Sequence, residues 1–189
     1  MFAELLVERT SSFVKLTPLQ ISQLEDHFHL LNRWNKVLNL SAIRDVESIV
    51  ERHYCESLFL GAHLPQKPAT IGDIGTGAGF PGIPVAIQMP YSQVSLIESH
   101  QRKSVFLIEA TRGLGNIRVV SKRAEALDER FDWVIMRGVN FSETEDVVRK
   151  LASNVAFLGG AENPSPRFTW NNLKLPWGKQ RFLWIGRFT

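Results

Sequence analysis

The segment IGDIGTGAGFPGIP is the part of the chain whose residue types and spacing most clearly indicate chemistry. Gly75, Gly77 and Gly79 are two residues apart, and Gly82 follows three residues later. Because glycine has no side chain and adopts positive φ readily, such a run lets a ligand lie directly on the backbone. Asp73 comes just before the first of these glycines, at the end of an apolar strand. Its carboxylate either orders the turn by accepting hydrogen bonds from the turn's amides or attracts a cationic ligand.

Two classes of cofactor are compatible with this turn. Gly77, Gly79 and Gly82 satisfy the dinucleotide pattern G-x-G-x-x-G, in which a pyrophosphate lies on a helix N-terminus. A nearby carboxylate opposes phosphate binding, whereas S-adenosylmethionine carries a sulfonium and an ammonium and no phosphate. The position of Asp73 therefore favours S-adenosylmethionine over NAD. A strand-to-helix turn that binds no ligand is the remaining alternative.

Other candidate site residues lie where strands are expected to end, which is where open α/β sheets bind ligands. Glu98 lies 25 residues after Asp73, and its carboxylate suits the two hydroxyls of a ribose. Capping of the following helix is the alternative for Glu98. Ala124 and Glu125 follow the third strand, where backbone amides can read an adenine edge. Arg137 ends the fourth strand and is expected to face the cleft, with a surface salt bridge as the alternative.

Length and composition limit the class of protein. The chain has 189 residues, 44% of them hydrophobic, which fits one domain of ordinary size with a small appendage. No apolar stretch approaches the roughly 18 residues that a bilayer requires, and Glu4 and Glu8 argue against a signal peptide. The single cysteine, Cys55, excludes an internal disulfide and suits a reducing cytosol. We therefore expect a cytoplasmic protein without a membrane segment or a metal site, and no feature demands more than a monomer.

The N-terminal third of the chain is predicted to be helical. Thr17-Pro18 is typical of a helix start, and apolar residues then recur at helical spacing. A second helix is predicted over Asp45–Leu60, followed by a proline-containing connector over Gly61–Ala69. We place a domain boundary in this connector. Residues 1–66 are then an N-terminal helical extension, and residues 67–189 are the S-adenosylmethionine-dependent domain.

The rest of the chain alternates between strands and helices. Strands are predicted over Thr70–Ile74, Val94–Ile97, Ile117–Val120, Trp133–Met136 and Val155–Leu158. Helices are predicted over Pro84–Met89, His100–Arg112, Arg123–Leu127 and Glu143–Ala152. This alternation predicts a parallel sheet covered on both faces. At the C-terminal end, Arg167–Leu175 and Gln180–Phe188 flank a turn at Pro176–Lys179 and predict an antiparallel hairpin.

The C-terminal tail combines basic and aromatic residues. No acidic residue follows Glu162, and the basic residues after it are Arg167, Lys174, Lys179, Arg181 and Arg187. The aromatic residues among them are Phe168, Trp170, Trp177, Phe182, Trp184 and Phe188. They either form a surface that meets phosphates and stacks bases, or the aromatic side chains face the core of an edge hairpin. Strand alternation favours the core for the aromatic residues and leaves the charges available for RNA under either alternative.

Several segments together resemble the glucose-inhibited division protein B family. They are RWNKVLNLSAI, RHYCESL, DIGTGAGFPGIP, LIESHQRKSVFL, SKRAEAL and FDWVIMRG. The resemblance extends over nearly the whole chain. Members of that family are 16S ribosomal RNA guanine-N7 methyltransferases that use S-adenosylmethionine. The resemblance implies an α/β fold, a class I methyltransferase-like Rossmann sheet with a C-terminal antiparallel hairpin and an N-terminal helical extension. It implies methyl transfer to N7 of a guanine in 16S rRNA, with the RNA or the 30S subunit as the partner.

The resemblance also assigns roles to individual residues. It implies that Gly75, Phe80, Ala124, Glu125 and Arg137 contact the cofactor, beside Asp73, Gly77, Gly79 and Glu98 from the patterns above. It implies that Arg123, Arg137 and Arg181 serve the RNA substrate or the active cleft. Because guanine N7 has an exposed lone pair, no general base is required and no catalytic residue is assigned.

The sequence departs from the family near the fifth strand. The pair Gly159-Gly160 stands where the family usually carries Lys-Gly, and residues 161–166 are short where the family has a longer helical region. Gly138 follows Arg137 where the family usually has alanine. These departures motivate one alternative function, a cofactor-binding ribosome-assembly or regulatory protein with weak or no methyl transfer. An NAD-dependent oxidoreductase lacks a catalytic tyrosine-lysine or histidine arrangement, and the basic, aromatic tail disfavours a small-molecule methyltransferase.

Overall fold

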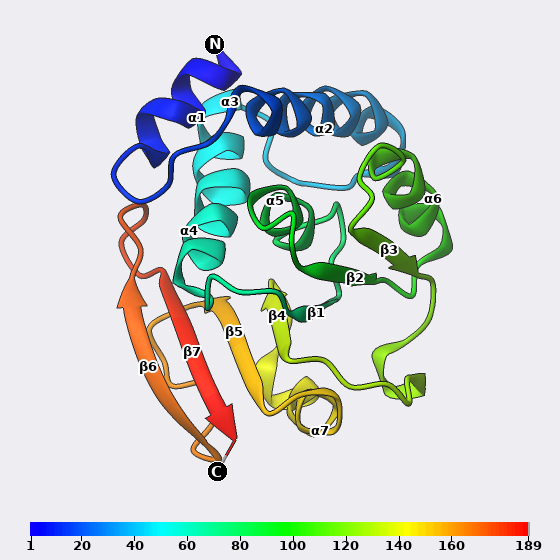
Figure 1. The fold of residues 1–189 in the computed structure, drawn as a ribbon, viewed down its shortest axis with the longest axis vertical. Coiled ribbons are helices and arrows are strands. Elements are labelled where there is room, and N and C mark those ends of the chain that lie inside the picture. Colours follow the sequence, from blue (N-terminus) through cyan, green and yellow to red (C-terminus); the bar gives the residue numbers. More distant parts are fainter. Residues whose placement is uncertain (189) are drawn as a thin grey trace.

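A single mixed sheet organises the protein, as a computed structural model of residues 1–188 shows (Figure 1). Its strands are β1 (Thr70–Ile74), β2 (Gln93–Ile97), β3 (Ile117–Val120), β4 (Trp133–Arg137), β5 (Asn154–Gly159), β6 (Phe168–Lys174) and β7 (Phe182–Phe188). Their order in the sheet is β3-β2-β1-β4-β5-β7-β6. Neighbours from β3 to β5 pair in parallel, and β7 pairs antiparallel with both β5 and β6. The predicted parallel sheet with a C-terminal hairpin is confirmed.

Helices before the sheet account for residues 2–63. They are α1 (Phe2–Thr10), α2 (Pro18–Leu38), α3 (Val46–Ile49), the π-helix η1 (Val50–Cys55) and α4 (Glu56–His63). Thr17 and Gln20 form a reciprocal capping box at the start of α2, which explains the sharp beginning predicted at Thr17-Pro18. The helix predicted over Asp45–Leu60 is present as the continuous run from α3 to α4. The run extends to His63, so the predicted connector begins after that residue and not at Gly61. Gly61 lies inside the helix, where a Cβ would overlap the Gln88 side chain.

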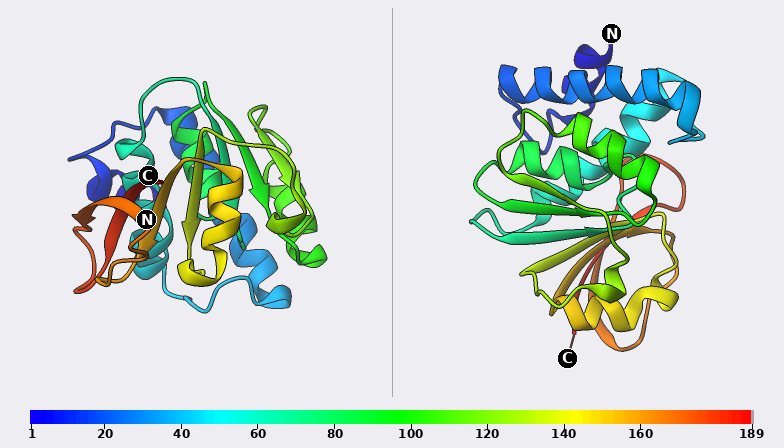
Figure 2. Two further views of the ribbon diagram at one scale, coloured as in Figure 1. Left: turned by 90° about the horizontal axis from the view of Figure 1, so that it is seen from below. Right: turned by 90° about the vertical axis from the view of Figure 1, so that its right-hand side faces the viewer.

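The helices lie on both faces of the sheet (Figure 2). One face carries α4, α5 (Gly82–Gln88) and α6 (Gln101–Ala110), with α2 beyond them, and the other carries α7 (Phe141–Leu151). One hydrophobic cluster joins residues of α1 and α2 to residues of β1, β2 and β4, such as Leu6, Leu24 and Ile135. The N-terminal helices and the sheet thus share one core, and the boundary after residue 66 stays a prediction.

Aromatic residues on the strands of the C-terminal hairpin pack on the α7 side of the sheet, whereas Trp177 in its turn packs against Phe13 and Phe59. Phe168 and Trp184 are buried, and Phe141 of α7 lies against Phe157, Phe168 and Trp170 with ring centroids 5.2–5.6 Å apart. The indole nitrogens donate to the short loop between β5 and β6, Trp184 to Gly160 O and Trp170 to Ser165 O. The structure therefore confirms the core alternative for most aromatic residues of the tail, whereas Phe182 is half-buried and belongs to neither hydrophobic cluster of the described residues.

Gly159 shows why a side chain is disfavoured at the end of β5. A Cβ atom at this position would overlap the ring of Phe157. A lysine here would require that ring to move, so the Gly159-Gly160 pair and the aromatic packing are two parts of one arrangement.

Candidate functional site

The glycine turn follows β1 at the carboxyl edge of the parallel strands. Gly75, Gly77 and Gly79 have φ of 67°, 61° and 89°, in the left-handed region that favours glycine. A Cβ at Gly79 would also overlap Ile83, so this glycine allows the turn to pack on α5. Gly75 and Gly77 instead line cavities, and they leave the backbone open to a ligand.

Asp73 shapes the turn from beneath. Its side chain is fully buried, and Oδ2 accepts hydrogen bonds from the Thr76 hydroxyl and from Gly82 N, the latter at 2.7 Å. The amide at the start of α5 is therefore paired with a protein carboxylate, at the place where a G-x-G-x-x-G site presents amides to a pyrophosphate. This contact supports a phosphate-free ligand. Of the two roles open for Asp73, the structure shows the ordering of the turn.

Burial raises the pKa of Asp73 to about 7. Between about pH 4 and pH 7 the folded protein keeps a proton that the unfolded chain has lost, so this carboxyl makes the protein less stable as pH rises through that range. Asp73→Asn removes the charge and keeps an acceptor. We expect the free energy of unfolding of the variant, relative to that of the wild type, to increase between pH 5 and pH 8 by up to a few kcal/mol, because one pKa unit corresponds to about 1.4 kcal/mol. Urea unfolding at both pH values measures this difference, and an equal difference at both would show that Asp73 is ionised throughout.

Glu98 follows β2 and also faces the turn. Its side chain is 7% exposed, with Oε2 accepting from Gly77 N at 3.1 Å and Oε1 from His100 N at 2.8 Å. The second contact is the capping alternative for α6, and the first ties Glu98 to the glycine turn. Both oxygens keep further lone pairs, so these contacts leave a role toward ribose hydroxyls open.

Two cavities meet at Gly75. The outer cavity, about 170 Å³, is lined by Gly75, Glu98, Arg123, Ala124 and Glu125, together with other residues. The inner cavity, about 150 Å³, is lined by residues that include Ser41, His53, Gly75, Gly77, Phe80 and Arg137. Together they reach the lower end of the range of about 300–1,000 Å³ that small-molecule sites occupy. The structure thus places most of the predicted site residues along two cavities that share Gly75, with Arg123 on the outer one and Arg137 on the inner one; Asp73, Gly79 and Arg181 are not among their lining residues.

The N-terminal helices supply a wall of the inner cavity. His53 of η1 stacks on Phe80 with centroids 4.7 Å apart, and its Nε2 lies 2.7 Å from the Ser41 hydroxyl. Burial, together with the positive charge of Arg137, lowers the pKa of His53 to about 3, so the ring is neutral at physiological pH. His27 of α2 contacts Ala78 O at 3.0 Å. The helical extension is therefore part of the site.

Arg137 lies at the end of β4 beside a buried carboxylate. Its Nε is 3.9 Å from Glu56 Oε2, and Arg181 binds the same carboxylate through Nε and Nη2 at 3.1 and 2.6 Å. Burial lowers the pKa of Arg137 to about 10, which leaves it positively charged at neutral pH. The structure thus brings Arg137 and Arg181 together, whereas Arg123 lines the other cavity.

Some residues of this site were missed by the sequence analysis. Glu56, Arg52, His53 and Ser41 lie in the segments RHYCESL and LNLSAI, which contributed to the resemblance without an assigned role. The spacing of Arg52 and Glu56, four residues apart on a helix, was the one local signal of an ion pair.

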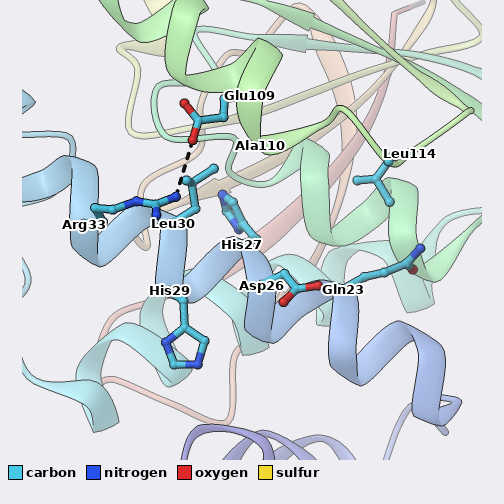
Figure 3. A pocket seen from close by; sticks show the side chains of 10 residues that line it. Gln23, Asp26, His27, His29, Leu30, Arg33, Glu109, Ala110 and Leu114 are labelled. Atoms are coloured by element: carbon cyan, nitrogen blue, oxygen red, sulfur yellow. Dashed lines mark hydrogen bonds and ion pairs between the residues drawn. The ribbon is translucent and has the colours of Figure 1, made fainter.

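A larger cavity of about 490 Å³ lies between α2 and the end of α6 (Figure 3). Asp26, His27, Arg33 and Glu109 are among its lining residues, and Arg33 pairs with Glu109 at 3.4 Å. It lies away from the carboxyl edge of the strands, and it contains none of the predicted site residues. Within residues 1–188, no group of histidine, cysteine and acidic side chains is arranged to hold a metal ion, and no helix is long and apolar enough to cross a bilayer.

Comparison with protein families gives one matching description. A family model described as GidB, rRNA small subunit methyltransferase G, matches residues 20–158. The ribosomal RNA small subunit methyltransferase G of Stenotrophomonas maltophilia is 47% identical over 115 residues, which cover 59% of this chain and 53% of that protein. The one of Burkholderia ambifaria is 38% identical over 168 residues, which cover 84% and 72%. The chain thus spans about half the length of several curated relatives that it matches.

Solved structures share the fold at low sequence identity. A SAM-dependent methyltransferase from Aquifex aeolicus matches with a TM-score of 0.57 and 16% identity, over 75% of this chain and 93% of that chain. The ribosomal protein L11 methylase from Lactobacillus delbrueckii subsp. bulgaricus matches with a TM-score of 0.56 and 18% identity, over 70% and 77%. These matches confirm the predicted class I methyltransferase-like fold, and at this identity they concern the fold alone.

Proposed function

The chain belongs to the rRNA small subunit methyltransferase G family, and we propose that it transfers a methyl group from S-adenosylmethionine to N7 of a guanine in 16S rRNA. One structural observation supports the cofactor most directly. The Asp73 carboxyl group accepts a hydrogen bond from the Gly82 amide at the start of α5, and Glu98 accepts one from Gly77 in the same glycine turn. The Gly82 amide is therefore not free for a pyrophosphate, and the Glu98 carboxylate beside the turn suits a cationic, phosphate-free ligand.

Each of the two cavities then has a role. The outer cavity holds the adenosyl group, with Glu98 toward the ribose and the backbone of Ala124 and Glu125 toward the adenine. The inner cavity, between the turn and Arg137, receives the guanine beside the methyl donor. S-adenosylmethionine supplies an electrophilic methyl group on a sulfonium. The protein aligns the two partners and excludes water, which is worth about 7–11 kcal/mol in favourable cases.

The residues of the inner cavity fit a reaction without proton abstraction. N7 of guanine attacks through its own lone pair, so no residue has to act as a base. His53 is neutral and stacked on Phe80, and both rings line the cavity that would receive the base. The guanine must leave its stack to reach this cavity, which costs a few kcal/mol.

Binding and transfer are measured separately to test this function. We expect isothermal titration to show S-adenosylmethionine binding, and tritium from the labelled methyl group to appear in 30S subunits as N7-methylguanine in 16S rRNA. Binding without transfer would instead support the ribosome-assembly or regulatory protein suggested by Gly159 in place of lysine. Binding of NADH in preference to S-adenosylmethionine would contradict both functions.

A further inference from the structure

A buried carboxylate at the start of α4 collects three arginines from three parts of the chain. The side chain of Glu56 is 0% exposed. Arg181, just before β7, binds it through two hydrogen bonds at 3.1 and 2.6 Å. Arg52 of η1 places Nε 3.4 Å from Oε1, and Arg137 at the end of β4 places Nε 3.9 Å from Oε2. One negative charge thus faces three positive charges.

Among the three arginines, only Arg181 makes hydrogen bonds to this carboxylate. Arg52 and Arg137 make ion pairs with Glu56 but no hydrogen bond to it, and Arg52 Nε and Arg137 Nη1 are buried without a hydrogen-bond partner among residues 1–188. Buried donors without partners are unfavourable, and so is the surplus charge of Arg137, whose side chain is largely buried. One arginine is enough to neutralise the charge of Glu56. The positive charges of the other two are therefore available to a further anion.

The cluster opens toward the site and toward solvent. Arg137 lines the inner cavity, and exposure of the side chain increases from 13% for Arg137 to 22% for Arg181 and 43% for Arg52. An anion from solution can therefore reach the arginines while a neighbouring group lies in the inner cavity. Arg52 also belongs to a π-helix, a rare conformation that occurs frequently at functional sites.

We propose that the guanidinium groups of Arg52, Arg137 and Arg181 bind a backbone phosphate next to the methylated guanine, and that Glu56 is the positioning residue that holds them together. Arginine suits this role because its planar donors match the oxygens of a phosphate. The inference rests on the proposed function for the identity of the RNA. It adds Arg52 and Glu56, which neither the sequence patterns nor the resemblance assigned.

Arg52→Gln tests the phosphate contact, because Arg52 is the most exposed member of the cluster. We expect KM for 30S subunits to rise roughly tenfold, kcat to stay within about twofold, and binding of a labelled single-stranded RNA to weaken to a similar extent. The slope of log KM against log salt should become shallower by about 0.7–0.9, the value of one phosphate contact. Arg33→Gln is the matched control, because it removes one charge from an exposed ion pair between α2 and α6 and should change none of these quantities.

Glu56→Gln and Glu56→Asp test the positioning role. We expect Gln to raise KM for 30S subunits roughly tenfold, and Asp to recover part of the loss because it keeps the charge. A purely structural role would lower stability in both variants and leave KM alone, which would overturn the assignment of Glu56.

The outcomes separate this inference from the function on which it rests. Absence of methyl transfer by the wild-type chain would contradict the proposed function. Comparing the RNA affinity of Arg52→Gln with that of the wild type would still test the phosphate site. Transfer and RNA binding by Arg52→Gln that equal those of Arg33→Gln would contradict the phosphate site alone, even if Glu56→Gln failed to fold.

Discussion

Glu98→Ala is expected to lower the affinity for S-adenosylmethionine about a hundredfold. The Glu98 carboxylate lies on the outer cavity, where we propose that it accepts hydrogen bonds from both ribose hydroxyls. Hydrogen bonds to a charged group contribute about 1.5–3 kcal/mol each, so the loss of two gives at least this factor. The substitution also removes the acceptor of Gly77 N and loosens the glycine turn. Isothermal titration at constant pH and salt measures the dissociation constant.

Two further variants show where this loss arises. Glu98→Gln keeps one acceptor and is expected to lose about tenfold in affinity. Glu109→Ala removes a carboxylate at the C-terminal end of α6, the helix that begins just after Glu98, and should change the affinity less than about twofold. Because Glu98 also caps α6, each variant is first checked for an unchanged circular dichroism spectrum. An unaltered dissociation constant for a folded Glu98→Ala would rule out the ribose contact.

The strands of this protein could be predicted closely because local signals mark their ends. β1 and β3 have the predicted bounds. β1 is followed by glycines, which weaken a strand because they have no side chain to pack. β7 starts two residues later than predicted, since Gln180 and Arg181 belong to the turn. α5 starts at Gly82, two residues before the predicted Pro84, because Asp73 accepts from the Gly82 amide and fixes the first turn. That acceptor comes from another element, which no local pattern reveals.

The candidate site divides in the same way. The glycine turn, Glu98, Ala124 and Glu125 follow strands in sequence, so topology alone brings them to one edge of the sheet. The cluster around Glu56 depends on packing between α4 and the C-terminal hairpin, and Arg181 lies 125 residues after Glu56. His53 likewise reaches Phe80 only because the helical extension packs on the sheet. Contacts of this kind depend on the whole core, and single-sequence patterns do not encode them.

The aromatic hairpin packs around the short loop that follows β5. Trp184 is 5% exposed, lies opposite Phe157 in the sheet, and donates to Gly160 O. Its ring and that of Trp170, with centroids 6.1 Å apart, cover this part of the sheet and hold the short loop through two indole hydrogen bonds. Rings on the strands thus cover the sheet beside this short loop.

Trp184→Ala is therefore expected to lower the free energy of unfolding by about 3–5 kcal/mol, the usual range for a buried tryptophan. This is a large share of the roughly 5–15 kcal/mol that stabilises a domain, so the melting temperature should fall steeply. Trp184→Phe, which keeps a ring and loses the bond to Gly160 O, should lose about 1–2 kcal/mol. Val37→Ala, at an exposed position of α2, should stay within about 0.5 kcal/mol of the wild type. Urea unfolding measures all three, and a loss below about 1 kcal/mol for Trp184→Ala would mean that the loop and the hairpin are held by other contacts.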